Sequence, residues 1–288
     1  MNENGTIINN VAGNKVANVF EVISTISGEV GAIPAGTKIL IVRFKGCNLC
    51  CSYCDTPLSR ERDYKEAWVT VEDMVNKINR KAKILNIKHI MFTGGEPLLQ
   101  AEFMLAVIEA LEKENNGYTY TVETNGSISP DAFLPNVMWL FLIENNRLSF
   151  VVDIKLDMIC KQAYVASMLS WFCSFLMTFT TPVLRKAIIF KIPIKDVEEV
   201  KEAVDVVTFF CRESKNIVGG DYVIPYGIFF SPIISNGVVL NSSGVPDNKT
   251  MIDLIEKVVC KPLFGQCEVT KGLYVGLNFQ LHKILNVN

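Results

Sequence analysis

The chain has 288 residues, of which 49% are hydrophobic and 20% charged, and its formal net charge is −2. This composition suits a globular protein with one sizeable core. It gives no support for a nucleic-acid or membrane-surface binder, since each of those needs a basic footprint. Nine cysteines, an odd number in a long chain, argue against a disulfide framework. Residues Met1–Asn10 lack the basic and apolar regions of a signal peptide, so we expect a cytoplasmic protein with its thiols available for metal.

Apolar, β-branched runs alternate with helical patterns along the chain, after a strand-like Val19–Ile23. The predicted strands are Lys38–Phe44, His89–Thr93, Tyr118–Glu123, Phe150–Ile154, Ala187–Ile192 and Tyr222–Pro232. The predicted helices are Val71–Leu85, Ala101–Lys113, Val197–Cys211 and Lys249–Val259, the first with Thr70 as a candidate cap. This alternation predicts an α/β fold with a mainly parallel sheet. Sheets of this kind bind their ligands at the carboxyl ends of the strands.

One segment, residues 163–184, contains no charged residue and is long enough to span a bilayer. It also carries several Ser and Thr residues and a Pro near its end, and no Lys/Arg cluster marks one side as cytoplasmic. We therefore expect a helix buried in the domain or covered by a second subunit, and we do not expect a membrane partner.

Three cysteines on one short loop, Cys47, Cys51 and Cys54, form the pattern C-x3-C-x2-C. Three thiolates can hold three irons of a four-iron, four-sulfur cluster and leave the fourth iron open to a small molecule. Cys50 is adjacent to Cys51, so the sequence alone also allows C-x2-C-x3-C. A structural zinc site would require four ligands, and no second Cys or His pair with suitable spacing follows.

Polar motifs follow three more of the predicted strands, at the edge where the cysteine loop begins. They are Thr93-Gly94-Gly95-Glu96-Pro97, Glu123-Thr124-Asn125-Gly126 and Asp153-Ile154-Lys155. Each has a structural alternative: a tight turn with an N-terminal acid, an Asn-Gly turn, and an internal ion pair. The charges of the third motif share one face of an apolar strand and need partners there. Convergence of four such strand ends is a stronger signal than any single motif.

Together these motifs resemble the radical S-adenosylmethionine (SAM) superfamily, and within it the family of 7-carboxy-7-deazaguanine synthases. The resemblance also draws on Ile26-Ser27-Gly28-Glu29, Arg43, Cys54-Asp55-Thr56, Leu98-Leu99-Gln100 and Gln280-Leu281-His282-Lys283. It implies a partial, modified (βα) barrel and a homodimer. It also implies a single catalytic domain over residues 19–288, preceded by an N-terminal extension over residues 1–18.

The resemblance further implies a reaction and a set of ligands. The radical formed from SAM would act on a pterin, 6-carboxy-5,6,7,8-tetrahydropterin, and ring contraction with loss of ammonia would give 7-carboxy-7-deazaguanine. An electron donor such as flavodoxin or ferredoxin would serve the [4Fe-4S] cluster, whose ligands would be Cys47, Cys51 and Cys54. Mg²⁺ would bind Thr56. The implied SAM contacts are Tyr53, Gly95, Glu96, Asn125, Asp153 and Lys155. The implied substrate contacts are Ile26, Ser27, Gly28, Glu29, Arg43 and Thr93.

The chain departs from the family pattern at a few positions. Ser27 and Val30 stand where the family usually has Gln and Gly, and Leu156 follows Lys155 where Pro is frequent. Two other functions are compatible with the loop: a glycyl-radical-enzyme activase, and a non-catalytic iron–sulfur or zinc-binding interaction protein. Of the two histidines, His89 enters a buried strand, where a structural role is expected.

Overall fold

A computed structural model of the chain describes residues 8–9, 15–28, 33–54, 56–60, 68–133, 136–177, 187–195, 197–219, 227–235, 238–239, 253, 257 and 274–278. The chain forms two compact units. Unit 1 comprises residues 1–26, 37–124 and 132–149, and unit 2 comprises residues 27–36, 125–131 and 150–288.

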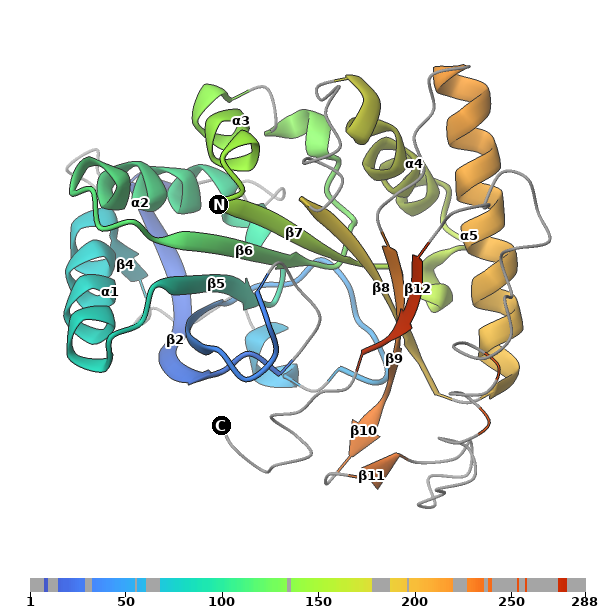
Figure 1. Ribbon diagram of the computed structural model, residues 1–288, viewed down its shortest axis with the longest axis horizontal. Coiled ribbons are helices and arrows are strands. Elements are labelled where there is room, and N and C mark those ends of the chain that lie inside the picture. Colours follow the sequence, from blue (N-terminus) through green and yellow to red (C-terminus); the bar gives the residue numbers. More distant parts are fainter. Residues whose placement is uncertain are drawn as a thin grey trace. The chain divides into compact units, whose positions relative to one another are not determined.

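Unit 1 is built on a mixed set of strands (Figure 1). β2 (Lys15–Ile26) pairs antiparallel with β1 (Ile8–Asn9), β3 (Lys38–Phe44) and β4 (Trp68–Thr70). From β3 the pairing becomes parallel, through β5 (His89–Gly94) to β6 (Thr119–Thr124). The predicted parallel arrangement is confirmed for β3, β5 and β6, whereas β2 runs against them.

The helices of unit 1 are α1 (Val71–Leu85), α2 (Ala101–Lys113) and α3 (Val137–Glu144). The bounds predicted for α1 and α2 are confirmed. Thr70 caps α1 by accepting a hydrogen bond from the Asp73 backbone N–H at 3.1 Å, which satisfies a donor that the helix leaves unpaired. α3 was not predicted from the sequence, because its residues are apolar up to the final Glu144 and give no helical periodicity.

Aromatic rings connect the parallel strands of unit 1 to α2. Phe44 of β3 stacks on Phe92 of β5 with centroids 6.2 Å apart, and Phe92 stacks on Tyr120 of β6 at 6.3 Å. Phe103 of α2 meets Phe44 edge-to-face. All four side chains are buried, so this core fixes the ends of β3 and β5 relative to each other.

Unit 2 contains the parallel strands β7 (Leu148–Asp153), β8 (Ile188–Ile194), β9 (Gly227–Pro232) and β12 (Tyr274–Leu277), and β7 enters it from unit 1. Its helices are α4 (Gln162–Met177) and α5 (Val197–Val218), and a short hairpin joins β10 (Ile234–Ser235) to β11 (Val238–Val239). Phe172 of α4 stacks on Phe190 of β8 at 4.1 Å and on Phe210 of α5 at 5.2 Å. These rings form the core of the unit.

The uncharged segment forms α4 over its first part. Tyr164, Met168, Trp171 and Phe172 are all buried, so the predicted buried helix is confirmed. Among the described residues, no helix combines the length and the apolar character that a membrane span requires. Most of the predicted helix Lys249–Val259 and the terminal Gln280–Lys283 motif lie outside the described residues. The predicted boundary between residues 18 and 19 falls within β2, and the division into extension and domain stays a prediction.

His89 lies at the start of β5 and is buried, as expected of a structural residue. Its ring nitrogens lie 2.7 Å from the Thr119 hydroxyl and 3.0 Å from the Thr121 hydroxyl, both on β6. Burial lowers the pKa of His89 to about 4, because the charged ring would lose its hydration.

This depressed pKa predicts a pH dependence of stability. Between about pH 6.5 and pH 4 the unfolded chain binds a proton at His89 and the folded chain does not. The free energy of unfolding should therefore fall by up to about 3 kcal/mol as the pH decreases through this range. Urea unfolding at a series of pH values measures the effect, and His89→Gln should remove it. A His89→Gln curve parallel to that of the unchanged chain would contradict the assignment.

Candidate functional site

The cysteine loop is attached at its start to the glycine motif that follows β5. The Gly95 N–H donates to the Phe44 carbonyl at 2.9 Å, and the Glu96 N–H donates to the Gly46 carbonyl at 2.8 Å. The Gly46 N–H in turn donates to the Ser59 carbonyl at 2.7 Å. Backbone bonds thus fix the start of the loop to a strand end of the same sheet, and Ser59 beyond the loop bonds back to that start.

Two glycines make this close approach possible. A Cβ at Gly94 would lie 2.3 Å from the Phe44 carbonyl oxygen, and one at Gly95 would lie 2.1 Å from the Gly46 carbonyl oxygen. Gly94 also has a φ of 121°, which L side chains rarely adopt. The structure gives a reason for these glycines: the neighbouring backbone fills the space that a side chain would occupy.

Glu96 is fully buried and begins a 3-10 turn, η3 (Pro97–Gln100). Its Oε1 accepts hydrogen bonds from the Leu98 backbone N–H at 3.0 Å and from the Thr124 hydroxyl at 2.7 Å. One oxygen of the Glu96 carboxylate therefore has the structural role offered as the alternative, that of an N-terminal acid on a turn. A contact between Glu96 and a ligand ammonium stays a prediction.

The three predicted cluster ligands, Cys47, Cys51 and Cys54, form no disulfide among the described residues and are half-buried, while Cys50 is exposed. Arg60, at the end of η1 (Pro57–Arg60), contacts this loop. Its Nη2 donates to the Cys51 carbonyl at 2.7 Å and its Nη1 to the Cys50 Sγ at 3.3 Å. A hydrogen bond to the Cys54 thiol raises the pKa of Arg60 above its usual value, against a smaller effect of burial.

The donor set of this loop fits an iron–sulfur cluster, because its cysteines form no disulfide in the described part of the chain and because such clusters are held by thiolates. The thiols are not gathered into a finished site. In the part of the chain that the structure describes, no three His, Cys, Asp or Glu side chains are arranged to hold a metal ion. Metal-binding residues often take up their final arrangement only when the metal binds, so the three thiols would come together around the cluster.

Two predicted substrate contacts lie next to each other in the sheet. Arg43 of β3 and Thr93 of β5 are neighbours in register. The Arg43 guanidinium donates to Glu21 of β2 at 2.5 Å, and the Thr93 hydroxyl donates to Glu123 of β6 at 3.1 Å. The structure thus gives each of these groups an acidic neighbour on the next strand.

The remaining predicted contacts near the N-terminus are divided between the units. Ile26 ends β2 in unit 1, whereas Ser27 and Gly28 belong to unit 2 and are buried. The Ser27 carbonyl accepts a hydrogen bond from the Gly36 N–H at 2.8 Å, which closes the segment between them. Glu29 lies outside the described residues.

Tyr53 and Thr56 lie on the cysteine loop and at the start of η1. Both are half-buried. The Thr56 carbonyl accepts hydrogen bonds from the Ser59 backbone N–H at 3.0 Å and from the Ser59 hydroxyl at 2.7 Å. These bonds shape the turn that presents the Thr56 side chain.

In unit 2, Asp153 at the end of β7 forms ion pairs with two lysines. Its Oδ2 lies 2.6 Å from the Lys155 Nζ and its Oδ1 lies 3.3 Å from the Lys191 Nζ. The three side chains are 13%, 13% and 5% exposed, so water screens these charges little. The internal ion pair that the sequence offered as an alternative is present, and Lys191 of β8 extends it.

Tyr164 of α4 connects Asp153 and Lys155 with Asn125. Its hydroxyl oxygen lies 2.8 Å from the Lys155 N–H, 3.1 Å from the Asp153 carbonyl and 3.2 Å from the Asn125 carbonyl. Further along α4, Ser167 donates to the Gly126 carbonyl at 2.8 Å and Trp171 to the Ile128 carbonyl at 2.9 Å. The apolar helix therefore holds the loop that begins at Asn125.

The sequence analysis missed three residues of these sites. Lys191 is a charge within an apolar strand, and the argument applied to Asp153 would have found it. Tyr164 is one aromatic among many in an uncharged segment. Arg60 is one of several basic residues beyond the cysteine loop. Only the turn of η1 distinguishes it, by directing its side chain to the thiols.

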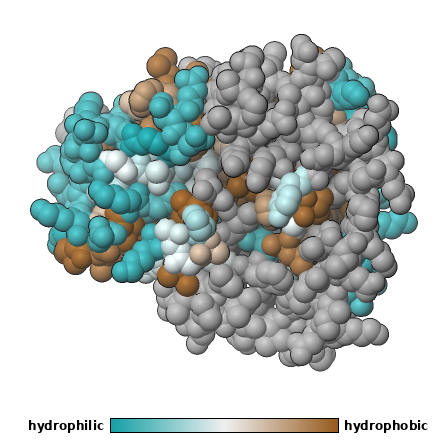
Figure 2. All heavy atoms as spheres, viewed as in Figure 1, coloured by the Kyte–Doolittle hydropathy of each residue, from teal (hydrophilic) through white to brown (hydrophobic). Residues whose placement is uncertain are grey.

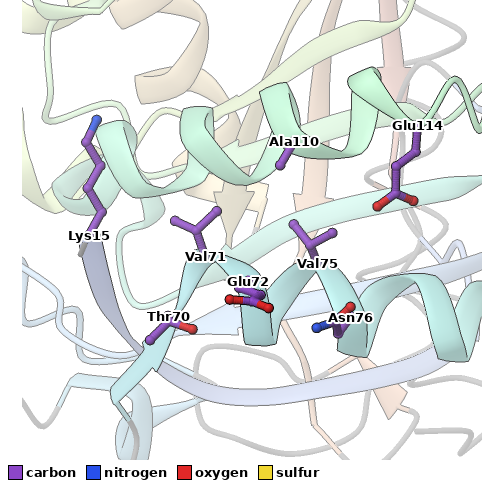
Figure 3. A pocket seen from close by; sticks show the side chains of 8 residues that line it. All are labelled: Lys15, Thr70, Val71, Glu72, Val75, Asn76, Ala110 and Glu114. Carbon is purple, nitrogen blue, oxygen red and sulfur yellow. The ribbon is translucent and has the colours of Figure 1, made fainter. Parts of the chain in front are cut away.

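A separate groove lies between α1 and α2 (Figure 3). Val71 and Val75 of α1 point toward α2, while Lys15 and Glu114 lie at its two ends. None of the predicted site residues lines it. Figure 2 shows mainly hydrophilic atoms over these helices, with hydrophobic atoms near one end of α1, where Ile84 is exposed. We attribute the groove to the packing of the two helices.

Comparison with known proteins gives consistent matches. The sequence profile of the radical SAM superfamily matches residues 41–135. A 7-carboxy-7-deazaguanine synthase from Clostridium acetobutylicum is 29% identical over 207 residues, which cover 72% of this chain and 80% of that protein. One from Methanothermobacter thermautotrophicus is 36% identical over 116 residues, which are 40% of this chain and 43% of that protein. The crystal structure of QueE from Escherichia coli aligns with 76% of this chain and 85% of its own, at 19% identity and a TM-score of 0.47.

Proposed function

We propose that this chain is a radical SAM enzyme that converts 6-carboxy-5,6,7,8-tetrahydropterin into 7-carboxy-7-deazaguanine with loss of ammonia. The observation that carries the proposal is the backbone junction between the C-x3-C-x2-C loop and Gly94-Gly95-Glu96. It joins the cluster motif to the strand end that the superfamily uses for SAM. The similarity to the Clostridium acetobutylicum synthase, over 80% of that protein, supports this substrate.

The cofactors of this reaction are a [4Fe-4S] cluster and SAM. When bound and reduced, they supply a 5′-deoxyadenosyl radical that abstracts hydrogen from the substrate. We assign Cys47, Cys51 and Cys54 as cluster ligands, because these three cysteines lie on one loop with the spacing C-x3-C-x2-C. That loop is fixed at Gly46 to Glu96 and Ser59, so the chain decides where the cluster is held.

The proposed SAM contacts are Tyr53, Gly95, Glu96, Asn125, Asp153 and Lys155, of which the last three belong to one set. Tyr164 supports this set, since its hydroxyl bonds to the backbone of all three members. The Asp153 carboxylate, oriented by Lys155 and Lys191, would accept hydrogen bonds from ribose hydroxyls.

The proposed substrate contacts are Ile26, Ser27, Gly28, Glu29, Arg43 and Thr93. Arg43 offers a planar guanidinium that can bind the pterin carboxylate, and Glu21 holds it by one nitrogen. Thr56 would bind Mg²⁺, since a hydroxyl and a substrate carboxylate are hard oxygen ligands. We also propose an electron donor such as flavodoxin or ferredoxin, a homodimer, and a reducing cytoplasm as the place of action.

Anaerobic incubation tests the proposal directly. The chain is reconstituted with iron and sulfide, reduced with dithionite, and incubated with SAM and the tetrahydropterin. We expect 5′-deoxyadenosine and 7-carboxy-7-deazaguanine by mass spectrometry, and a change in the cluster's paramagnetic resonance signal when SAM is added. If the cluster cleaves SAM but no deazapurine forms, the proposed substrate is wrong and another radical SAM reaction is favoured. If the chain binds no cluster, the proposal that it is a radical SAM enzyme is wrong.

A further inference from the structure

Arg60 lies against the cysteine loop and is not one of the proposed cluster ligands, SAM contacts or substrate contacts. It ends η1, which begins three residues after Cys54. The turn is fixed to the loop, because Ser59 accepts from Gly46, the residue before Cys47. Arg60 is therefore carried by a segment whose position relative to the first ligand is set by backbone hydrogen bonds.

The Arg60 guanidinium spans the second half of the loop. It donates to the Cys51 carbonyl at 2.7 Å and to the Cys50 Sγ at 3.3 Å, and the Cys54 thiol is near enough to raise its pKa. A third donor, Nε, is buried and has no hydrogen-bond partner among the described residues. A fixed positive charge thus lies beside two of the three proposed cluster ligands.

We propose that Arg60 is a positioning residue of the cluster loop whose charge raises the reduction potential of the [4Fe-4S] cluster, an inference that rests on the proposed function. Reduction adds one electron to a cluster that three thiolates already make anionic, and no bond forms or breaks. A nearby cation stabilises the more negative, reduced state. Net charge and hydrogen bonds to sulfur are among the factors that set these potentials. Cluster reduction by a low-potential one-electron donor is therefore easier with Arg60 in place.

The same geometry gives Cys50 a role. The Cys50 thiol is exposed and accepts a hydrogen bond from the Arg60 guanidinium. This bond holds the thiol next to Arg60, so it competes less with Cys51 as a cluster ligand. Arg60 binds the backbone of Cys51 and the side chain of Cys50. This difference favours the register in which the Cys51 side chain turns to the cluster.

The test is a redox titration of the reconstituted full-length chain, followed by the paramagnetic resonance of the reduced cluster without SAM or substrate. Arg60→Gln removes the charge but keeps an N–H₂ group for the Cys51 carbonyl. We expect this substitution to lower the equilibrium constant for cluster reduction about tenfold, which is a decrease in midpoint potential of about 59 mV for one electron. Arg60→Lys, which keeps the charge, should restore most of the potential. Arg80→Met removes an exposed positive charge on α1 and should leave the potential unchanged.

The outcomes separate this inference from the proposed function. An unchanged potential in Arg60→Gln, with a full cluster, overturns the role of Arg60 and leaves the enzyme intact. If Arg60→Gln holds no cluster, Arg60→Lys decides: a potential near that of the unchanged chain supports the role of the charge, and a much lower one contradicts it. An unchanged chain that binds no cluster overturns both proposals.

Discussion

Replacing Cys51 by alanine is expected to abolish cluster binding, whereas replacing the adjacent Cys50 should leave the cluster intact. A missing thiolate leaves an iron without its protein ligand. The loss should exceed the roughly 10- to 100-fold reduction in metal affinity that follows removal of an outer supporting partner. The measurement is iron and sulfide per chain after anaerobic reconstitution, with the visible absorption of the cluster.

The two variants are matched controls for each other, because they differ by one position and remove the same thiol. Cys50 is exposed and bonded to Arg60, while Cys51 is half-buried. If Cys50→Ala lost its iron and Cys51→Ala kept it, the ligands would be Cys47, Cys50 and Cys54. The proposed spacing would then be wrong.

Replacing Gly95 by alanine is expected to destabilise unit 1 by about 3 kcal/mol, at the upper end of the typical range for overpacking. The added methyl group would lie 2.1 Å from the Gly46 carbonyl oxygen and 3.0 Å from the Ser59 carbonyl oxygen. Both are backbone atoms, so neither can rotate away. The cysteine loop or the strand end must move, and the hydrogen bond from Gly95 to Phe44 should be lost with it.

Urea unfolding of the chain without iron or SAM measures this effect separately from any loss of cofactor contacts. Gly117→Ala is the control, because a Cβ there meets nothing within 4 Å and only its φ of 66° opposes the change. We expect about 1 to 2 kcal/mol for that backbone strain. Equal destabilisation by the two variants would show that the contact between the loop and the strand end is not tight.

Local patterns predicted the elements that obey a simple period. The helices α1 and α2 and the strand β3 have the predicted bounds, because their apolar residues recur at helical or strand spacing and flanking residues mark their ends. The pattern failed for α3, where every position before the final Glu144 is apolar or aromatic, and for the full length of β2, whose polar residues pair with neighbours on both sides.

The candidate site likewise has features that the sequence predicts and features that it does not. Ligand identity and spacing are properties of the chain, so the sequence by itself determined a thiolate loop, a glycine-rich strand end and a charged strand end. It also indicated the superfamily. Neighbours from distant parts of the chain are set by packing. Lys191 reaches Asp153 because β8 pairs with β7, and Tyr164 reaches Asn125 because α4 is buried against its own unit.

The tertiary structure alone decided what the glycines and the basic residues do. Gly94 and Gly95 admit the backbone of the cysteine loop, since hydrogen bonds draw two strand ends closer than a Cβ allows. Arg60 contacts the thiols because η1 turns its side chain back over the loop. A sequence records which groups are present, but the distances between them arise only when the strands pair and the core excludes water.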